Sequence, residues 1–221
     1  MSDFSTARQK MVDGQVRTSD VTDGRILDAM LEVPREVFIP GDRQQMAYLD
    51  LDLDVSPPGA PKRFLIKPAV TAKLLQAAEI RDVDKVLVVG AATGYAAALA
   101  ARLAAEVVAT ESDPALAATA SKVLSSLGCG KVAVRTAAAA EGDSAGGPYD
   151  VILLNGATEI VPEALCEQLG EGGRLVGVFA ASQPARATIV TRSHGNFGRR
   201  VLFDAQAPVL PGLERRPAFV F

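Results

Sequence analysis

Tryptophan is absent from this chain of 221 residues, and histidine and cysteine are scarce, with only His194, Cys129 and Cys166. Two cysteines are too few for a disulfide framework or a cysteine-based metal site, and one histidine excludes most metal sites and acid–base schemes that rely on histidine. We therefore expect no metal ion, and we assign no catalytic side chain.

The sequence also lacks a long apolar run and an excess of charge of one sign. No run reaches the roughly 18 residues of a membrane span, and the N-terminus lacks the basic and then apolar pattern of a signal peptide. With 23 Lys and Arg against 26 Asp and Glu, the net charge of −3 gives no electrostatic footprint for nucleic acid. We expect a cytoplasmic protein that binds neither membranes nor nucleic acid.

Hydrophobic residues make up 48% of the chain, which is enough for a sizeable core. Residues 1–67 are acid-rich and interrupted by prolines, and they contain two short amphipathic stretches, Thr6–Arg17 and Gly24–Glu32. We predict that this part forms an N-terminal helical cap with a substrate-side loop, and that residues 68–221 form the core of the same compact unit.

Apolar runs rich in β-branched residues alternate with helical patterns from Pro68 onward. One helix is well marked, because Asp113 suits its N-cap, Pro114 its first turn and Gly128 its end. The alternation is typical of an α/β fold with a mostly parallel sheet, closed by a hairpin of the last two strands. The runs predicted as strands are Lys85–Val89, Glu106–Thr110, Lys131–Arg135, Tyr149–Leu154, Arg174–Phe179, Ala187–Arg192 and Val201–Asp204.

A glycine-bounded turn, Gly90–Gly94, follows the first of these strands, and Glu111 ends the second strand 21 residues after Gly90. In an open α/β sheet, ligands bind at the carboxyl ends of the strands, and a carboxylate at this distance accepts the hydroxyls of a ribose. Two alternatives stay open, since paired glycines also serve helix–strand packing and Glu111 also suits the acidic start of a helix. Together the two features indicate a nucleoside-containing cofactor.

The spacing of the turn disfavours a nicotinamide dinucleotide. That cofactor requires Gly-x-Gly-x-x-Gly, whereas the residues between Gly90 and Gly94 are Ala91, Ala92 and Thr93. A carrier without a pyrophosphate, such as S-adenosylmethionine, fits this turn better.

Longer motifs run in the same order along the chain from about Met11 to Thr191. They include Val33–Pro40, Ala47-Tyr48, Tyr149–Ile152, Val161–Leu165 and Gly172–Val176. In these motifs the chain resembles the protein-L-isoaspartate O-methyltransferases. The resemblance implies a seven-stranded, Rossmann-like S-adenosylmethionine-dependent fold that methylates the α-carboxyl group of isoaspartyl residues in damaged proteins or peptides.

The implied reaction asks little acid–base chemistry of the protein. The substrate carboxylate is ionised at pH 7 and attacks the sulfonium methyl without a general base, so positioning supplies most of the catalysis. The residues predicted to contact the cofactor are Gly90, Ala92, Thr93, Gly94, Glu111, Ala137 and Asn155.

This chain departs from the family on the substrate side. The family has a Gly-Gln-Thr-Ile-Ser motif whose serine lies at the reacting carboxylate, and Ile66 stands at that serine position. An isoleucine cannot donate a hydrogen bond to a carboxylate. The nearby Lys62, Arg63 and Lys67 are alternative cations for a carboxylate, or simply a solvated surface.

The cofactor side also differs. Val88 stands where the family has an acid, Ala92 replaces the middle glycine, and Ala137 stands where the family has an acid near the adenine amino group. Alanine is tolerable at position 92 only if the backbone there keeps φ below zero. Losing two or three hydrogen bonds weakens cofactor binding by roughly ten- to a thousandfold. Two hypotheses follow, an isoaspartyl methyltransferase and a catalytically degenerate relative that acts as a binding or scaffold protein.

Overall fold

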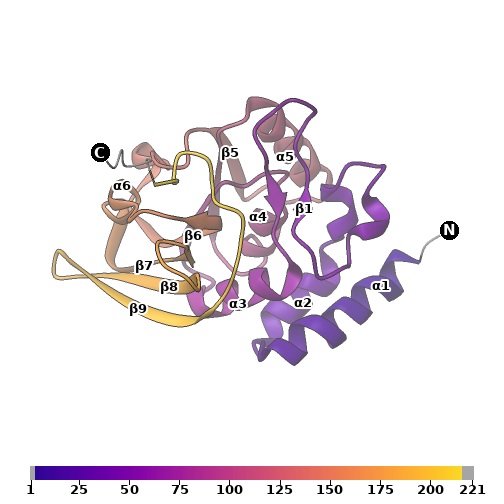
Figure 1. Cartoon of the computed structure of the whole chain (residues 1–221), viewed down its shortest axis with the longest axis horizontal. Helices are drawn as coiled ribbons and strands as arrows, with labels where there is room; N and C mark the ends of the chain where they lie inside the picture. The colour runs from indigo at the N-terminus through magenta and orange to yellow at the C-terminus, as the bar shows by residue number, and fades with distance from the viewer. Residues whose placement is uncertain (1–2, 216–221) are drawn as a thin grey trace.

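A central seven-stranded sheet organises the computed structural model of the protein, which describes residues 3–215 (Figure 1). Five adjacent strands are parallel and the last two are antiparallel, which confirms the predicted mostly parallel α/β fold. Strand order reverses between β3 and β6, so the carboxyl ends of these two strands mark the expected ligand position. In sheet order the strands are β5 (Val132–Thr136), β4 (Glu106–Glu111), β3 (Lys85–Val89), β6 (Tyr149–Thr158), β7 (Leu169–Phe179), β8 (Arg186–Ser193) and β9 (Asn196–Asp204).

Four helices follow the predicted alternation: α3 (Pro68–Ala78), α4 (Tyr95–Ala100), α5 (Pro114–Ser126) and α6 (Glu163–Cys166). The start of α5 is as predicted, because the Asp113 carboxylate accepts hydrogen bonds from the backbone N–H groups of Ala115 and Leu116. Helix α4 is short and ends at Ala100. Within residues 3–215, none of the helices combines the length and the hydropathy needed to cross a membrane.

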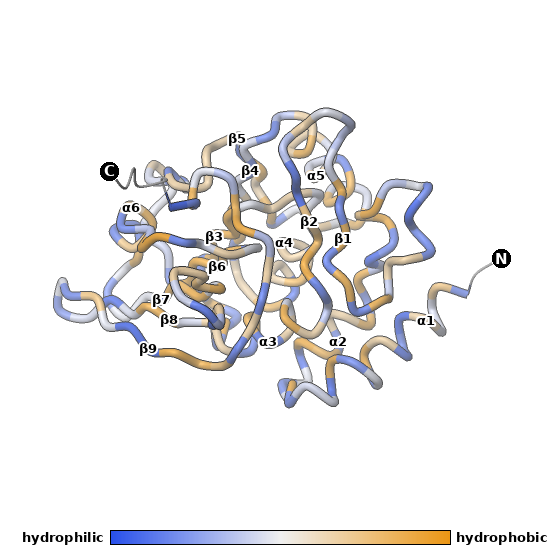
Figure 2. Tube along the Cα trace, viewed as in Figure 1, coloured by the Kyte–Doolittle hydropathy of each residue, from blue (hydrophilic) through white to orange (hydrophobic). Residues whose placement is uncertain are grey.

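Alternate side chains of the central strands enter two separate hydrophobic clusters. Val86 and Val88 of β3 belong to the larger cluster, with side chains of α3, α4 and α5, whereas Leu87 and Val89 belong to the smaller one, with α6. Both faces of the sheet are therefore buried, which explains the continuous apolar runs. Figure 2 shows the hydrophobic residues gathered along these central strands.

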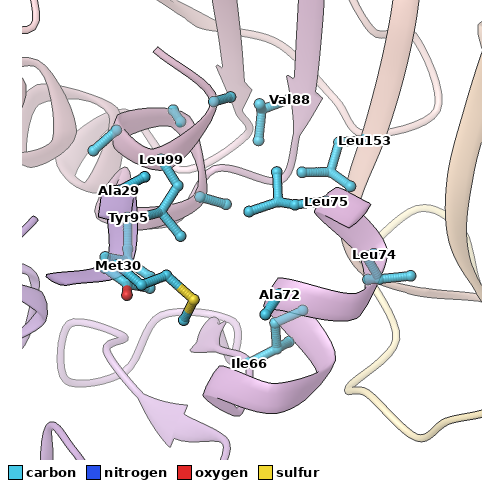
Figure 3. Packing of buried hydrophobic residues seen from close by; sticks show 14 of the residues in the cluster. Ala29, Met30, Ile66, Ala72, Leu74, Leu75, Val88, Tyr95, Leu99 and Leu153 are labelled. Carbon is cyan, nitrogen blue, oxygen red and sulfur yellow. The ribbon is translucent and has the colours of Figure 1, made fainter. Parts of the chain in front are cut away.

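The N-terminal part packs against the larger cluster. It comprises α1 (Phe4–Met11), η1 (Val12–Val16), η2 (Arg17–Ser19), α2 (Gly24–Glu32), η3 (Arg35–Phe38) and η4 (Gln44–Met46). Both predicted amphipathic stretches are thus helical, with α1 continued by one π-helical segment. One buried cluster includes Met30 and Ile66 together with Leu75 and Tyr95 (Figure 3). The division into residues 1–67 and 68–221 stays a prediction, and its outer ends, 1–2 and 216–221, lie outside the described residues.

Two features lie at the carboxyl edge of the sheet, and the sequence predicted a loop for the first, without its hairpin form, but not the second. The first is a small hairpin of β1 (Leu53–Asp54) and β2 (Phe64–Leu65), joined by residues 55–63, which we call the hairpin loop. The second is the C-terminal strap, residues 205–213, which runs along the end of β6 and forms a parallel bridge between Val209 and Ala157.

At the opposite edge, a buried carboxylate joins the turn ahead of β3 to β7. Asp84 accepts hydrogen bonds at 2.8 Å from Nε of Arg81 and from Nη2 of Arg174, a residue of β7. Burial opposes ionisation of Asp84, but the hydrogen bonds from Arg81 and Arg174 outweigh it and hold the pKa of this carboxyl below its usual value.

We predict that Asp84→Asn lowers the free energy of unfolding at pH 7 by about 1.5–3 kcal/mol, because charge-assisted hydrogen bonds to two arginines are lost. The folded-state pKa is depressed, so this stabilisation is complete above the unfolded value and disappears as the pH falls through the folded value. Urea denaturation at several pH values measures the effect. Asp82→Asn, at an exposed neighbour, is the control, and an equal loss in both variants contradicts the assignment.

Candidate functional site

The turn after β3 is shaped by two glycines with positive φ. Gly90 has φ +71°, and a Cβ there would collide with the side chain of Leu210 in the C-terminal strap. Gly94 has φ +102° and begins α4, where a Cβ would lie 3.1 Å from Cδ1 of Leu124 in α5. Gly94 thus serves helix packing, the alternative left open for this pair, and Gly90 serves the close approach of the strap.

Glu111 is completely buried at the end of β4 and lies beside this turn, as its spacing predicted. Its Oε2 accepts a hydrogen bond from the backbone N–H of Ala92 at 2.8 Å. Its Oε1 accepts one from the backbone N–H of Asp113 at 3.0 Å and one from Nε of Arg63 at 2.8 Å. The carboxylate therefore already holds an ion pair with a guanidinium of the same chain.

The condition of a negative φ at Ala92 is not met, because its φ is +52°. Three hydrogen bonds hold the turn in this conformation: the N–H of Ala92 donates to Glu111, and the N–H groups of Gly90 and Ala91 both donate to the carbonyl of Thr110 at 2.9 Å. Alanine here occupies a region that L-residues adopt at a cost.

The other predicted residues divide between the carboxyl edge and the N-terminal cap. Nδ2 of the buried Asn155 donates to the carbonyl of Gly90 at 2.9 Å, and the N–H of Ala137 donates to the carbonyl of Glu111 at 3.1 Å. Thr93 faces the cap instead, where its hydroxyl donates to the carbonyl of Phe38 at 2.6 Å. The structure therefore links Gly90, Ala92, Glu111, Ala137 and Asn155 by hydrogen bonds, whereas Thr93 and Gly94 face other helices.

The space over this edge is nearly filled. The cavity there has a volume of about 10 Å³, and it lies between Arg63 and Ile66 on one wall and Gly90, Asn155 and Leu210 on the other. A water molecule needs about 10–15 Å³ when volume is measured in this way. The cavity therefore holds one water at most and no nucleoside.

Two apolar residues that stand where the family has polar ones, Ile66 and Val88, pack in the hydrophobic core. Ile66 is 2% exposed and Val88 is completely buried, and both belong to the larger hydrophobic cluster (Figure 3). The carbonyl of Ile66 accepts a hydrogen bond at 2.9 Å from Nη2 of Arg35, which is itself fully buried beside Tyr95. The serine position of the family is thus an ordinary core position in this chain.

Of the three basic residues considered for a carboxylate, only Arg63 turns inward, with 4% of its surface exposed. Lys62 is exposed and pairs with Asp54 inside the hairpin, and Lys67 is half-buried. Arg63 does bind a carboxylate, but this carboxylate belongs to Glu111. Neither this pair nor the strap that carries Leu210 was predicted from the sequence.

We predict that Ala92→Gly raises the free energy of unfolding by up to about 1 kcal/mol. Glycine relieves the strain of the positive φ, and its greater backbone entropy in the unfolded chain offsets only part of this gain. Ala91→Gly, at a neighbour that is not among the positive-φ residues, is the matched control and is expected to destabilise. Urea denaturation measures the free energy of unfolding of both variants, and a decrease in Ala92→Gly contradicts the prediction.

Known proteins resemble this chain over most of its length. The model of the protein-L-isoaspartate(D-aspartate) O-methyltransferase family matches residues 6–199. The protein-L-isoaspartate O-methyltransferase of Koribacter versatilis is 37% identical over 212 residues, which cover 96% of this chain and 94% of the relative. One from Rhodopseudomonas palustris (strain ATCC BAA-98 / CGA009) is 36% identical over 206 residues, or 92% and 93% of the two chains.

Solved structures agree on the fold. A protein-L-isoaspartate O-methyltransferase superposes with a TM-score of 0.83 at 25% identity, covering 94% of this chain and 67% of the other. A putative enzyme of this name from Plasmodium falciparum, in complex with S-adenosyl-L-homocysteine, gives 0.77 at 17% identity over 95% and 99% of the chains. The resemblance seen in the sequence motifs is confirmed: this chain belongs to the protein-L-isoaspartate O-methyltransferase family.

Proposed function

We propose that the protein is a protein-L-isoaspartate O-methyltransferase, which transfers the methyl group of S-adenosylmethionine to the α-carboxyl group of isoaspartyl residues in damaged proteins or peptides. The observation that carries this proposal is the family match over residues 6–199, which spans both the N-terminal part and most of the sheet. Relatives of that name align with nearly the whole chain at 36–37% identity.

The chemistry of this substrate suits the residues of the carboxyl edge. An isoaspartyl carboxylate is already ionised at neutral pH and needs no general base, so the work of the protein is to orient two molecules and exclude water. The only histidine, His194, lies exposed in the β8–β9 turn and has no part in this proposal. We assign no catalytic side chain.

The space between the hairpin loop and the C-terminal strap does not admit S-adenosylmethionine. The carboxylate of Glu111 is held by Arg63, the side chain of Leu210 covers Gly90, and the cavity between Arg63 and Leu210 is about 10 Å³. The edge must rearrange before a nucleoside contacts Glu111. Contacts of the cofactor with Gly90, Ala92, Thr93, Gly94, Glu111, Ala137 and Asn155 stay a prediction.

The proposed setting of the enzyme is the cytoplasm, with proteins or peptides as substrates. The charge balance supports proteins or peptides as substrates, since a net charge of −3 offers no general attraction for nucleic acid.

A second candidate is a relative that binds a partner without transferring methyl groups. The comparisons give no reason to prefer it. One observation keeps it open to test, namely that Arg63, Ile66 and Leu210 close the edge where the cofactor is expected.

We predict methyl transfer from labelled S-adenosylmethionine to a peptide that contains one isoaspartyl residue, and none to the same peptide with a normal aspartyl residue. The product is a base-labile methyl ester on the isoaspartyl α-carboxyl group, located by mass spectrometry. No transfer to either peptide at saturating cofactor contradicts the proposal and favours the second candidate.

A further inference from the structure

The ion pair between Arg63 and Glu111 joins two segments that lie 48 residues apart in the sequence. The side chain of Arg63 is 5% exposed and that of Glu111 is fully buried, so neither charge is solvated by water. Nη2 of Arg63 also donates to the hydroxyl of Ser112, the residue after Glu111. An arginine desolvated in this way depends on its carboxylate partner.

Arg63 makes the hydrogen bonds that join the hairpin loop to the sheet, while Val55, at the base of the loop, packs in the larger hydrophobic cluster. Outside residues 54–63, the hydrogen-bond partners of this loop in the described chain are Glu111 and Ser112, and Arg63 reaches both. The base of the hairpin is anchored by buried residues such as Leu53 and Leu65, whereas its tip, around Pro58 and Gly59, is exposed. The loop is thus a flap with a fixed base, and Arg63 is its latch.

The opposite wall of the cavity is held more firmly. The backbone of the C-terminal strap exchanges hydrogen bonds with Ala157, whose N–H donates to Pro208 at 2.8 Å and whose carbonyl accepts from Leu210 at 2.9 Å. A third hydrogen bond, from the N–H of Glu159 to the carbonyl of Leu213 at 2.9 Å, closes the strap. Moving the hairpin loop away from the sheet breaks hydrogen bonds of one side chain, whereas moving the strap breaks backbone hydrogen bonds. The hairpin loop is therefore the wall that moves.

The latch uses the carboxylate that a nucleoside requires. The two hydroxyls of a ribose donate to a carboxylate at the end of the second strand of such a sheet. Here Oε1 of Glu111 already accepts from Arg63 and from the backbone of Asp113, and the buried guanidinium lies against the carboxylate. A ribose and Arg63 therefore compete for one acceptor and for one volume.

We propose that Arg63 is an affinity-determining residue that latches the hairpin loop over the cofactor edge, so that S-adenosylmethionine binds only after the Arg63–Glu111 pair breaks. This inference rests on the proposed function, because it takes the cofactor to be S-adenosylmethionine. The apparent dissociation constant then equals the intrinsic one divided by the fraction of unlatched protein.

The test is isothermal titration of the full chain and of Arg63→Gln with S-adenosylhomocysteine. Glutamine is short and uncharged, and it is the residue that the family motif has at this position, counted back from Ile66. We expect Arg63→Gln to lower the dissociation constant by about tenfold or more. Equal dissociation constants overturn the proposal, and so does the absence of binding by both proteins.

Arg81→Gln is the matched control, because Arg81 also pairs with a buried carboxylate at 2.8 Å but lies at the opposite edge of the sheet. Its dissociation constant is expected to equal that of the unaltered chain. A gain in affinity equal to that of Arg63→Gln shows that general loosening is responsible and overturns the latch.

A measurement on the unaltered chain covers the case in which Arg63→Gln does not fold. The Nε–H of Arg63, held by Glu111, gives a ¹⁵N–¹H signal that saturating S-adenosylhomocysteine must shift or remove. An unchanged signal in the bound state overturns the proposal. Arg63→Lys, which keeps a cation but loses the fork of donors, is expected to bind with intermediate affinity.

The failure of the latch and the failure of the proposed function give different results. If the unaltered chain methylates the isoaspartyl peptide and Arg63→Gln binds no tighter, the latch is wrong and the function stands. If Arg63→Gln binds S-adenosylhomocysteine tightly and neither protein methylates the peptide, the latch stands and the function is wrong.

Discussion

The arrangement of the carboxyl edge depends on one buried charge, the carboxylate of Glu111. Burying an ionised group costs several kcal/mol unless partners surround it, so this single side chain requires contacts from several segments at once. The turn after β3 supplies the N–H of Ala92, the start of α5 supplies that of Asp113, and the hairpin loop supplies Arg63. Three segments thus take their relative positions from one acceptor.

Features with a local or periodic cause could be predicted from the sequence. The β-branched runs gave the strands because both sheet faces are buried, and Asp113 with Pro114 gave the start of α5 through ordinary capping. The position of Glu111 beside the turn also followed from sequence spacing, because parallel strands end at a common edge. The family's motifs extended this prediction to the function class.

What escaped prediction has causes that are distant in the sequence. The inward orientation of Arg63 depends on a partner 48 residues away, and the apolar cover of Gly90 comes from Leu210, far beyond the last strand of the parallel part. The positive φ of Ala92 follows from hydrogen bonds to Glu111 and Thr110 rather than from the preference of alanine. In each case contacts between distant segments determine the conformation, and the local sequence does not indicate them.

The strap has a consequence for synthesis of the chain. Domains form progressively as the chain leaves the ribosome, N-terminal parts first. The parallel strands and both partners of the Arg63–Glu111 pair emerge well before residues 205–213, which alone cover Gly90 with Leu210. A nascent chain that ends at β9 therefore has its sheet complete while the strap side of its carboxyl edge is still open, and residues 205–213, made later, determine how wide that edge finally is.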